Sequence, residues 1–227
     1  MAKEKFILDA STIISISERC LIRILRNFAM GENVELVMPQ SVYNESVERP
    51  MHIKRFGLNA MRIKQGVDEG WLTVAKTDSE TRRTMKKLDD LTNNMFYLGK
   101  NVLKLVHEGE TEALALMKKY ESQILVIDER TTRMIIEDPI RLSSYLEFKY
   151  GSKVSVDENN LFEFKKFMGK FDIARSVELI AMAYERNYFE PELEQNYQSL
   201  SAALYAVKYA GCAVSLNEIE EYLRELG

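Results

Sequence analysis

The chain has 227 residues, of which 46% are hydrophobic and 29% are charged, and this balance excludes a disordered or membrane protein. Its net charge of -4 gives no whole-molecule field that attracts nucleic acid, so a polyanion would have to be held by a local basic patch or through bound cations. With only 10 glycines and 4 prolines, the chain lacks the frequent turns of a many-stranded sandwich, which favours a helix-rich or α/β protein.

Five short apolar runs predict β-strands. A continuous apolar run is typical of a strand in a parallel sheet that is covered on both faces. The first and fourth runs each stop at an aspartate. In chain order, the predicted strands are residues 6–8, 34–38, 71–74, 124–127 and, with the weakest pattern, 153–156.

Helical spacing fills the segments between these runs. The predicted helices are residues 12–29, 40–48, 51–69, 79–93 and 110–120. Strands that alternate with helices predict a three-layer α/β/α sandwich with a mainly parallel sheet.

The composition changes after residue 157, where strands disappear and only helical spacing continues, in segments 161–164, 177–188 and 197–209. We therefore predict a sheet domain over residues 1–157 and a helical C-terminal extension over residues 158–227. Because no linker rich in Gly, Pro or Ser separates the two, we expect the extension to pack on the domain.

Four carboxylates occupy corresponding positions in this pattern. Asp9 and Asp128 directly follow strands, Glu45 lies just inside the helix after strand 34–38, and Glu112 lies in the first turn of the helix that leads to Asp128. Ligands of open parallel sheets bind at the carboxyl ends of the strands, so we expect one shared site. Four carboxylates repel one another unless cations neutralise them, and oxygen ligands without His or Cys favour Mg²⁺ or Mn²⁺.

Each acid also has a structural explanation. An aspartate after a strand is often a helix N-cap, as Asp9 would be, and Glu45 alone is an ordinary solvated helix residue. Acidic side chains such as Glu110 and Glu112 favour a helix N-terminus in any case. The joint pattern favours the shared site, since independent surface residues would not fall at the same end of successive βα units.

Four sequence blocks, FILDAS from residue 6, SVYNE from 41, GETEALAL from 109 and ILVIDERTTR from 124, resemble the acidic motifs of PIN-domain nucleases, in the family's order. The resemblance covers roughly residues 5–157. It implies a compact α/β/α sandwich that cleaves RNA with Mg²⁺ or Mn²⁺. The implied metal ligands are Asp9, Glu45, Glu112 and Asp128, and Ser11 would orient the first aspartate. Many such proteins are toxins of toxin–antitoxin pairs, others process RNA, and some have lost catalysis.

Basic residues beside the acids are the expected substrate contacts. Arg130 and Arg133 follow Asp128 and could bind phosphate, and with Ser11 they form our predicted substrate-binding set. A denser basic cluster over residues 82–87 is more typical of a solvated helix face. The chain has neither a Gly-x-x-x-x-Gly-Lys-Ser/Thr loop nor a Gly-x-Ser-x-Gly elbow, which argues against an NTPase or a serine hydrolase.

These patterns predict a metal-dependent ribonuclease that acts on RNA. The alternatives are a PIN-like module that binds protein or RNA without cutting it, and the toxin of a toxin–antitoxin pair. Cys20 and Cys212 lie far apart and the N-terminus lacks a signal or membrane segment, so we expect a cytoplasmic protein that does not contact a membrane. The apolar helices of the extension suggest a homodimer or a protein partner.

Overall fold

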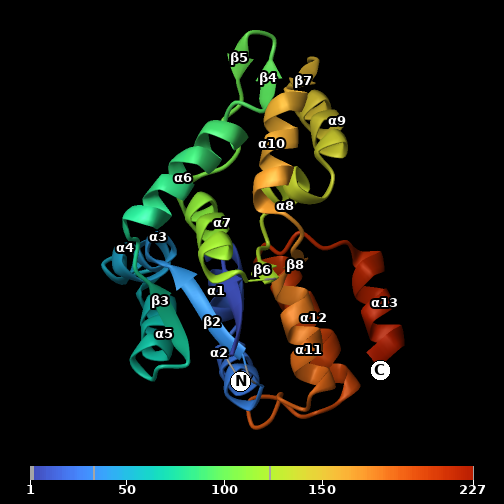
Figure 1. Ribbon diagram of the computed structural model, residues 1–227. Coiled ribbons are helices and arrows are strands. Elements are labelled where there is room, and N and C mark those ends of the chain that lie inside the picture. Colours follow the sequence, from blue (N-terminus) through green and yellow to red (C-terminus); the bar gives the residue numbers. More distant parts are fainter. Residues whose placement is uncertain (1–2, 33, 123, 227) are drawn as a thin grey trace.

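The computed structural model describes residues 3–32, 34–122 and 124–226. A five-stranded parallel sheet has the strand order β3-β2-β1-β6-β8, and a smaller antiparallel sheet has the order β5-β4-β7 (Figure 1). The parallel sheet consists of β1 (Glu4–Leu8), β2 (Val34–Pro39), β3 (Leu72–Ala75), β6 (Ile124–Val126) and β8 (Asp172–Ala174). The antiparallel sheet consists of β4 (Phe96–Leu98), β5 (Asn101–Val102) and β7 (Val154–Val156).

Strand β1 lies at the centre of the parallel sheet and is covered on both faces. Its alternate side chains enter opposite cores, Phe6 and Leu8 in one and Ile7 in the other. Leu8 pairs with Val126 of β6, and both are fully buried. This double burial explains the continuous apolar sequence of the strand and confirms the predicted α/β/α sandwich.

Helices from two regions of the chain cover the face that receives Phe6 and Leu8. They are α1 (Ala10–Glu18), α2 (Ile22–Gly31), α3 (Gln40–Tyr43), a π-helix (Asn44–Glu48), α4 (Arg49–Met51), α5 (Gly57–Asp68), α11 (Ser176–Glu185), α12 (Tyr197–Ala210) and α13 (Leu216–Leu226). The opposite face is covered by α6 (Ser79–Thr92), α7 (Glu108–Tyr120), α8 (Arg130–Glu137), α9 (Pro139–Tyr150) and α10 (Glu158–Met168). The small sheet lies at the upper end of the molecule beside α9 and α10 (Figure 1).

Two predicted helices are interrupted. The segment predicted as one helix over residues 12–29 is two helices, because Cys20 between them adopts a left-handed backbone with φ of 63°. The helix predicted over residues 51–69 begins only at Gly57, since the chain turns between α4 and α5.

Two strand predictions need correction. The run predicted as the fifth strand forms β7, but β7 pairs antiparallel with β4 in the small sheet. The C-terminal extension, predicted to have no strands, contributes β8 to the edge of the parallel sheet beside β6. β8 has only three residues, and a pattern so short is not distinguishable from a loop. The boundary at residue 157 stays a prediction.

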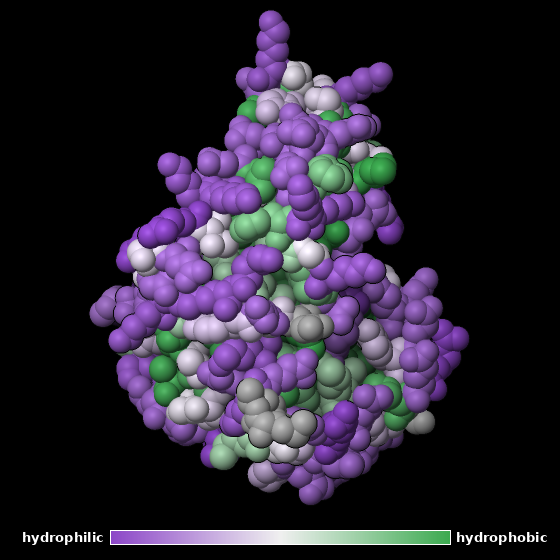
Figure 2. All heavy atoms as spheres, viewed as in Figure 1, coloured by the Kyte–Doolittle hydropathy of each residue, from purple (hydrophilic) through white to green (hydrophobic). Residues whose placement is uncertain are grey.

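The surface seen in Figure 2 is mostly hydrophilic, with hydrophobic groups scattered among the polar ones. Within the described ranges, no helix combines the length and the apolar character that crossing a bilayer requires.

Candidate active site

Asp9 is held in place at the carboxyl end of β1. It is the N-cap of α1, where its Oδ2 accepts hydrogen bonds from the backbone N–H of Ser11 at 3.0 Å and from the Ser11 hydroxyl at 2.7 Å. The residue is only 4% exposed. Because the cap uses Oδ2, the second oxygen, Oδ1, is left to face the start of α7.

The carboxylates of Asp9 and Glu45 converge beside Gly109. A methyl carbon built on Gly109 would lie 3.8 Å from Oδ1 of Asp9 and 3.7 Å from Oε2 of Glu45. Glu45 is exposed and comes from the π-helix that follows β2, the strand beside β1. π-helical turns are frequent at functional sites. The missing side chain of Gly109 therefore leaves a space that both carboxylates face.

Glu110, the residue after Gly109, is a third acid whose ionisation is affected by Asp9. Its Oε2 accepts a hydrogen bond from the backbone N–H of His107 at 3.0 Å, which caps the start of α7. Burial raises the pKa of Glu110 above its ordinary value, and the negative charge of Asp9 raises it further. Burial also raises the pKa of Asp9, and the charge of Glu45 acts in the same direction. Glu110 lies in the Gly-Glu-x-Glu block, where it was predicted only to favour the start of the helix.

Both carboxylate oxygens of Glu112 accept hydrogen bonds from the protein. It is 2% exposed, and its Oε2 accepts hydrogen bonds from the backbone N–H of Ser41 at 2.8 Å and from the Ser41 hydroxyl. Its Oε1 accepts a hydrogen bond from the hydroxyl of Thr77, which follows β3. Glu112 therefore ties α7 to the segments after β2 and β3.

Asp128 is also fully occupied by hydrogen bonds. It is 1% exposed, and Ser176 donates both its backbone N–H to Oδ1 at 2.7 Å and its hydroxyl to Oδ2 at 2.8 Å. Burial raises the pKa of Asp128, while the bonds from Ser176 oppose that rise. The Asp128 carboxylate thus binds Ser176, the first residue of α11. The sequence pattern did not predict this contact.

The structure brings the carboxylates of Asp9 and Glu45 together, while protein groups bind the carboxylates of Glu112 and Asp128. Among residues 3–32, 34–122 and 124–226, no group of three or more His, Cys, Asp or Glu side chains is arranged to hold a metal ion. Protein hydroxyl and N–H groups bind both oxygens of Glu112 and of Asp128. The shared metal site of the four acids stays a prediction.

Comparison with known proteins decides the family of this fold. A family model described as a PIN domain matches residues 5–138. The chain belongs to the PIN-domain family. PIN domains are usually nucleases, they typically use divalent metal ions, and they commonly bind RNA. No curated protein and no solved structure matches the chain. The match ends at Asp138, so α9 and all later elements lie outside the matched PIN segment.

The acids beside Gly109 fit the kind of ion that PIN domains typically use. Asp9, Glu45 and Glu110 offer only oxygen, which is the donor that hard cations prefer. Mg²⁺ is commonly held by one or two protein carboxylates together with water and substrate phosphates, so the meeting of two carboxylates is sufficient for such a site.

The two arginines predicted to contact phosphate, Arg130 and Arg133, belong to a cavity that neither Asp9 nor Glu45 lines. Arg130 and Arg133 line a cavity of about 700 Å³ between α8, α9 and the segment before α13. The guanidinium of Arg130 lies 5.7 Å from the ring centre of Tyr145, and Nη2 of Arg133 donates to the carbonyl of Ala213 at 3.2 Å.

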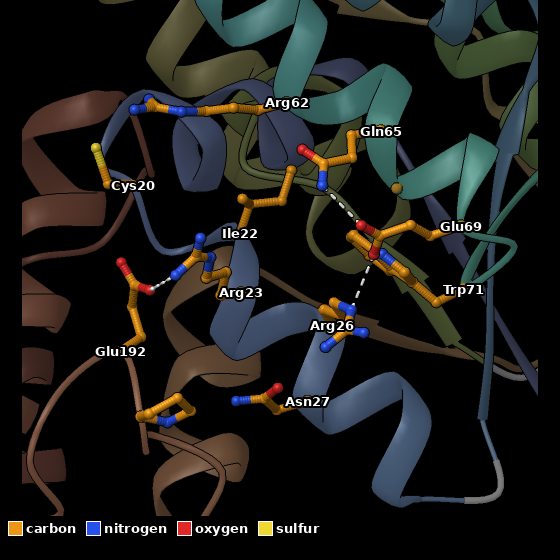
Figure 3. Close-up of a pocket in the computed structure, with 12 residues that line it drawn as sticks. Cys20, Ile22, Arg23, Arg26, Asn27, Arg62, Gln65, Glu69, Trp71 and Glu192 are labelled. Carbon is orange, nitrogen blue, oxygen red and sulfur yellow. Dashed lines mark hydrogen bonds and ion pairs between the residues drawn. The ribbon is translucent and has the colours of Figure 1, made fainter.

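A second cavity, of about 670 Å³, lies between α2 and α5 (Figure 3). Trp71 lines it and precedes β3, so this cavity is at the amino edge of the parallel sheet, whereas Asp9 is at the carboxyl edge. Two of its three arginines are paired with acids, Arg26 with Glu69 at 2.9 Å and Arg23 with Glu192 at 3.5 Å. The acidic edge therefore remains the candidate active site.

Proposed function

We propose that this PIN protein is a divalent-metal-dependent ribonuclease with its reacting centre where Asp9 and Glu45 meet beside Gly109. The observation that supports the proposal is the convergence of these two carboxylates on one space at the carboxyl edge of the sheet. An RNA phosphodiester is an anion, and it would be repelled by this cluster unless a cation lay between them. A bound Mg²⁺ or Mn²⁺ would supply that charge and Lewis acidity toward the phosphodiester.

Asp9 and Glu45 would hold the ion, with Glu110 as the neighbouring third carboxylate. Ser11 orients Asp9 by occupying one carboxylate oxygen, so the other remains directed at the space. No histidine base is required in this arrangement, because the carboxylates and ordered water can accept protons.

We further propose positioning roles for the remaining two acids of the predicted set. Glu112 holds Ser41, four residues before Glu45, and so fixes the start of the helical segment that carries Glu45. The backbone N–H of Asp128 donates to the Ser11 hydroxyl at 3.1 Å, and that hydroxyl holds Asp9. Glu112 would thus support Glu45 through its carboxylate, and Asp128 would support Asp9 through its backbone N–H.

One observation favours a second candidate, a PIN module that binds RNA or protein without cutting it. The protein itself satisfies both oxygens of Glu112 and of Asp128, which leaves fewer acids for metal than the expected four. The toxin role, the homodimer, a protein partner and the cytoplasmic location stay predictions.

The test is cleavage of a mixed RNA pool by metal-stripped protein to which Mn²⁺, Mg²⁺ or EDTA is added. We expect cleavage with either ion and none with EDTA. Asp9→Asn should lose at least about a hundredfold in rate, because Asn keeps the helix cap but removes the negative charge. Glu45→Gln should also be strongly impaired, and Glu48→Gln, an exposed acid on the same π-helix, is the matched control.

Equal cleavage by wild-type and Asp9→Asn protein would place the activity elsewhere or in a contaminant. Binding of RNA without cleavage under any of the metal conditions would favour the second candidate.

A further inference from the structure

We infer that the cavity between α8, α9 and residues 213–218, together with the exposed face of α9, binds single-stranded RNA. Arginines would contact phosphates there and Tyr145 would stack on a base. The inference takes its substrate class from the proposed function, but it adds a surface built largely from elements that follow the matched PIN segment.

The cavity is positively charged on a negatively charged protein. Five cationic and three acidic residues line it, which gives +2 where the whole chain carries -4. The cations are Arg130, Arg133, Arg141, Arg175 and Lys208, and the acids are Glu137, Asp138 and Glu218. Local charge of this kind is the feature that a chain of net negative charge needs to hold a polyanion.

The acids of the cavity are already engaged. Glu218 pairs with Arg175 at 2.9 Å, and Glu137 lies 3.7 Å from Arg133. Asp138 accepts the backbone N–H of Arg141 at 2.9 Å and so caps α9. These contacts lower the capacity of the acids to repel a phosphate.

Arg130 and Arg141 are the cations that remain available. Both are exposed, and within the described part of the chain neither forms an ion pair. In the other cavity, Figure 3 shows Arg23 directed at Glu192 and Arg26 at Glu69. Its third arginine, Arg62, donates to the carbonyl of Ser17 and to Oδ1 of Asn59. The α8–α9 cavity therefore carries two exposed arginines without an acidic partner in the described residues, whereas Arg62, the arginine of the other cavity without one, is partly buried.

Aromatic side chains lie beside these arginines. Arg141, Tyr145 and Lys149 recur every four residues on α9, so they share one face of the helix. Tyr145 is 37% exposed, and Phe148 on the same helix is 88% exposed. Basic groups alternating with exposed aromatic rings are the arrangement that single-strand binding proteins use for phosphates and bases.

The cavity is also linked to the proposed reacting centre. Ser11, which holds Asp9, accepts the backbone N–H of Asp128, and the carbonyl of Asp128 accepts the N–H of Ala213 at 3.3 Å. The carbonyl of Ala213 in turn accepts from Arg133. A short chain of hydrogen bonds through the protein thus joins the two places.

The test measures binding without cleavage. A labelled single-stranded RNA of about 12 nucleotides, within the usual range of single-strand site sizes, is titrated in EDTA and followed by fluorescence anisotropy at several salt concentrations. We expect Arg130→Gln/Arg141→Gln to weaken binding at least about tenfold. The slope of log affinity against log salt should fall by about 1.4, as expected for two lost phosphate contacts on a single strand.

Tyr145→Ala should weaken binding by roughly five- to a hundredfold, while Tyr145→Phe should retain it because the stacking ring remains. Arg23→Gln is the matched control, since it removes one charge from an exposed arginine in the other cavity. Unfolding curves of all variants establish that each is folded as the wild type.

An unchanged affinity and salt slope in the double variant would overturn the inference. So would the absence of RNA binding by the wild type, which would leave the α9 face as a surface for a protein partner. Loss of binding only in the α9 and cavity variants, without cleavage by the wild type under any metal condition, would refute the nuclease proposal and support the RNA surface.

Discussion

Ser176 gives both its backbone N–H and its hydroxyl to the carboxylate of Asp128, at 2.7 and 2.8 Å. Asp128 follows β6 inside the matched PIN segment, and Ser176 begins α11 outside it. A carboxylate at a helix N-terminus is stabilised by the unpaired N–H groups there and by the helix dipole. The contact therefore joins the C-terminal region to the sheet through buried, charge-assisted bonds.

Ser176→Ala should lower the free energy of unfolding by about 1–2 kcal/mol, because the buried Asp128 carboxylate loses one of its two bonds from Ser176. Urea denaturation measures the change. Ser152→Ala, at an exposed position, is the control and should be neutral. If the two variants have the same stability, the Asp128–Ser176 contact does not hold the C-terminal region on the sheet.

The sequence predicted the buried strands well, because burial on both faces is a strong constraint on their residues. Strands buried on both faces must be continuously apolar, so β1, β2, β3 and β6 were all identified from their residues. β8 could not be found in this manner, because three residues at a sheet edge need only one buried side chain, Ala174. Tertiary pairing with β6 makes it a strand.

The sequence predicted where the acids of the candidate site lie in the fold. It did not predict which groups they contact. Strand ends located Asp9 and Asp128 at the correct edge of the sheet, but they could not reveal which group each carboxylate meets. The partners Thr77 and Ser176 lie 35 residues before Glu112 and 48 residues after Asp128 in the chain, and no local pattern connects such distant residues. Glu110 was overlooked as part of the site because its capping role explained its presence sufficiently.

Gly109→Ala should leave the stability of the fold intact and weaken the binding of a metal ion. The added methyl would be in ordinary contact, 3.7 Å from Glu45 and 3.8 Å from Asp9, so the fold should accept it. Replacing a helical glycine should raise the free energy of unfolding by up to about 1 kcal/mol. The methyl would nevertheless fill the space between the carboxylates.

We therefore expect Gly109→Ala protein to be at least as stable as the wild type in EDTA, but to lose most of the rise in unfolding temperature that Mn²⁺ produces. Thermal unfolding with and without Mn²⁺ measures both effects. An undiminished Mn²⁺ shift in this variant would show that the ion binds away from Gly109.

The ionic network around Arg175 should make stability depend on acidic pH. Arg175 lies 2.9 Å from Glu218 and also pairs with Glu178. Burial acts to raise the pKa of Glu218, but the bonds from Ser215 and the charge of Arg175 outweigh it and lower that pKa to about 2. A folded-state pKa below the unfolded value of about 4.3 contributes stability above that value, which is lost as the pH falls toward 2.

Glu218→Gln should therefore be less stable than the wild type at pH 7, and the difference should shrink between about pH 4.5 and pH 2. Urea unfolding at a series of pH values tests this. A difference that stays constant with pH would mean that Glu218 stabilises the fold by packing and not by its charge.

Gly66→Ala should disturb the cavity of Figure 3 through Trp71, the only tryptophan of the chain. A methyl carbon on Gly66 would lie 2.4 Å from Cζ2 of the indole, so the ring must move. We expect a loss of about 1–3 kcal/mol in unfolding free energy, as overpacking usually costs. Tryptophan fluorescence should shift to the red, whereas Gly57→Ala, which meets only a backbone oxygen at 3.4 Å, should leave the spectrum unchanged.

Deletion of residues 158–227 should abolish a native fold. Of the 33 buried residues in the core cluster on the α1–α2 face, 14 lie in this segment, and the deletion also removes β8 from beside β6. The remaining chain would expose a large apolar face and an unpaired strand edge, both of which promote aggregation. We expect insoluble protein, or a soluble form that binds a hydrophobic dye and lacks a cooperative unfolding transition. A fragment 1–157 that unfolds cooperatively and binds no dye would instead establish that the sheet domain is stable without β8 and that the C-terminal region is an independent module.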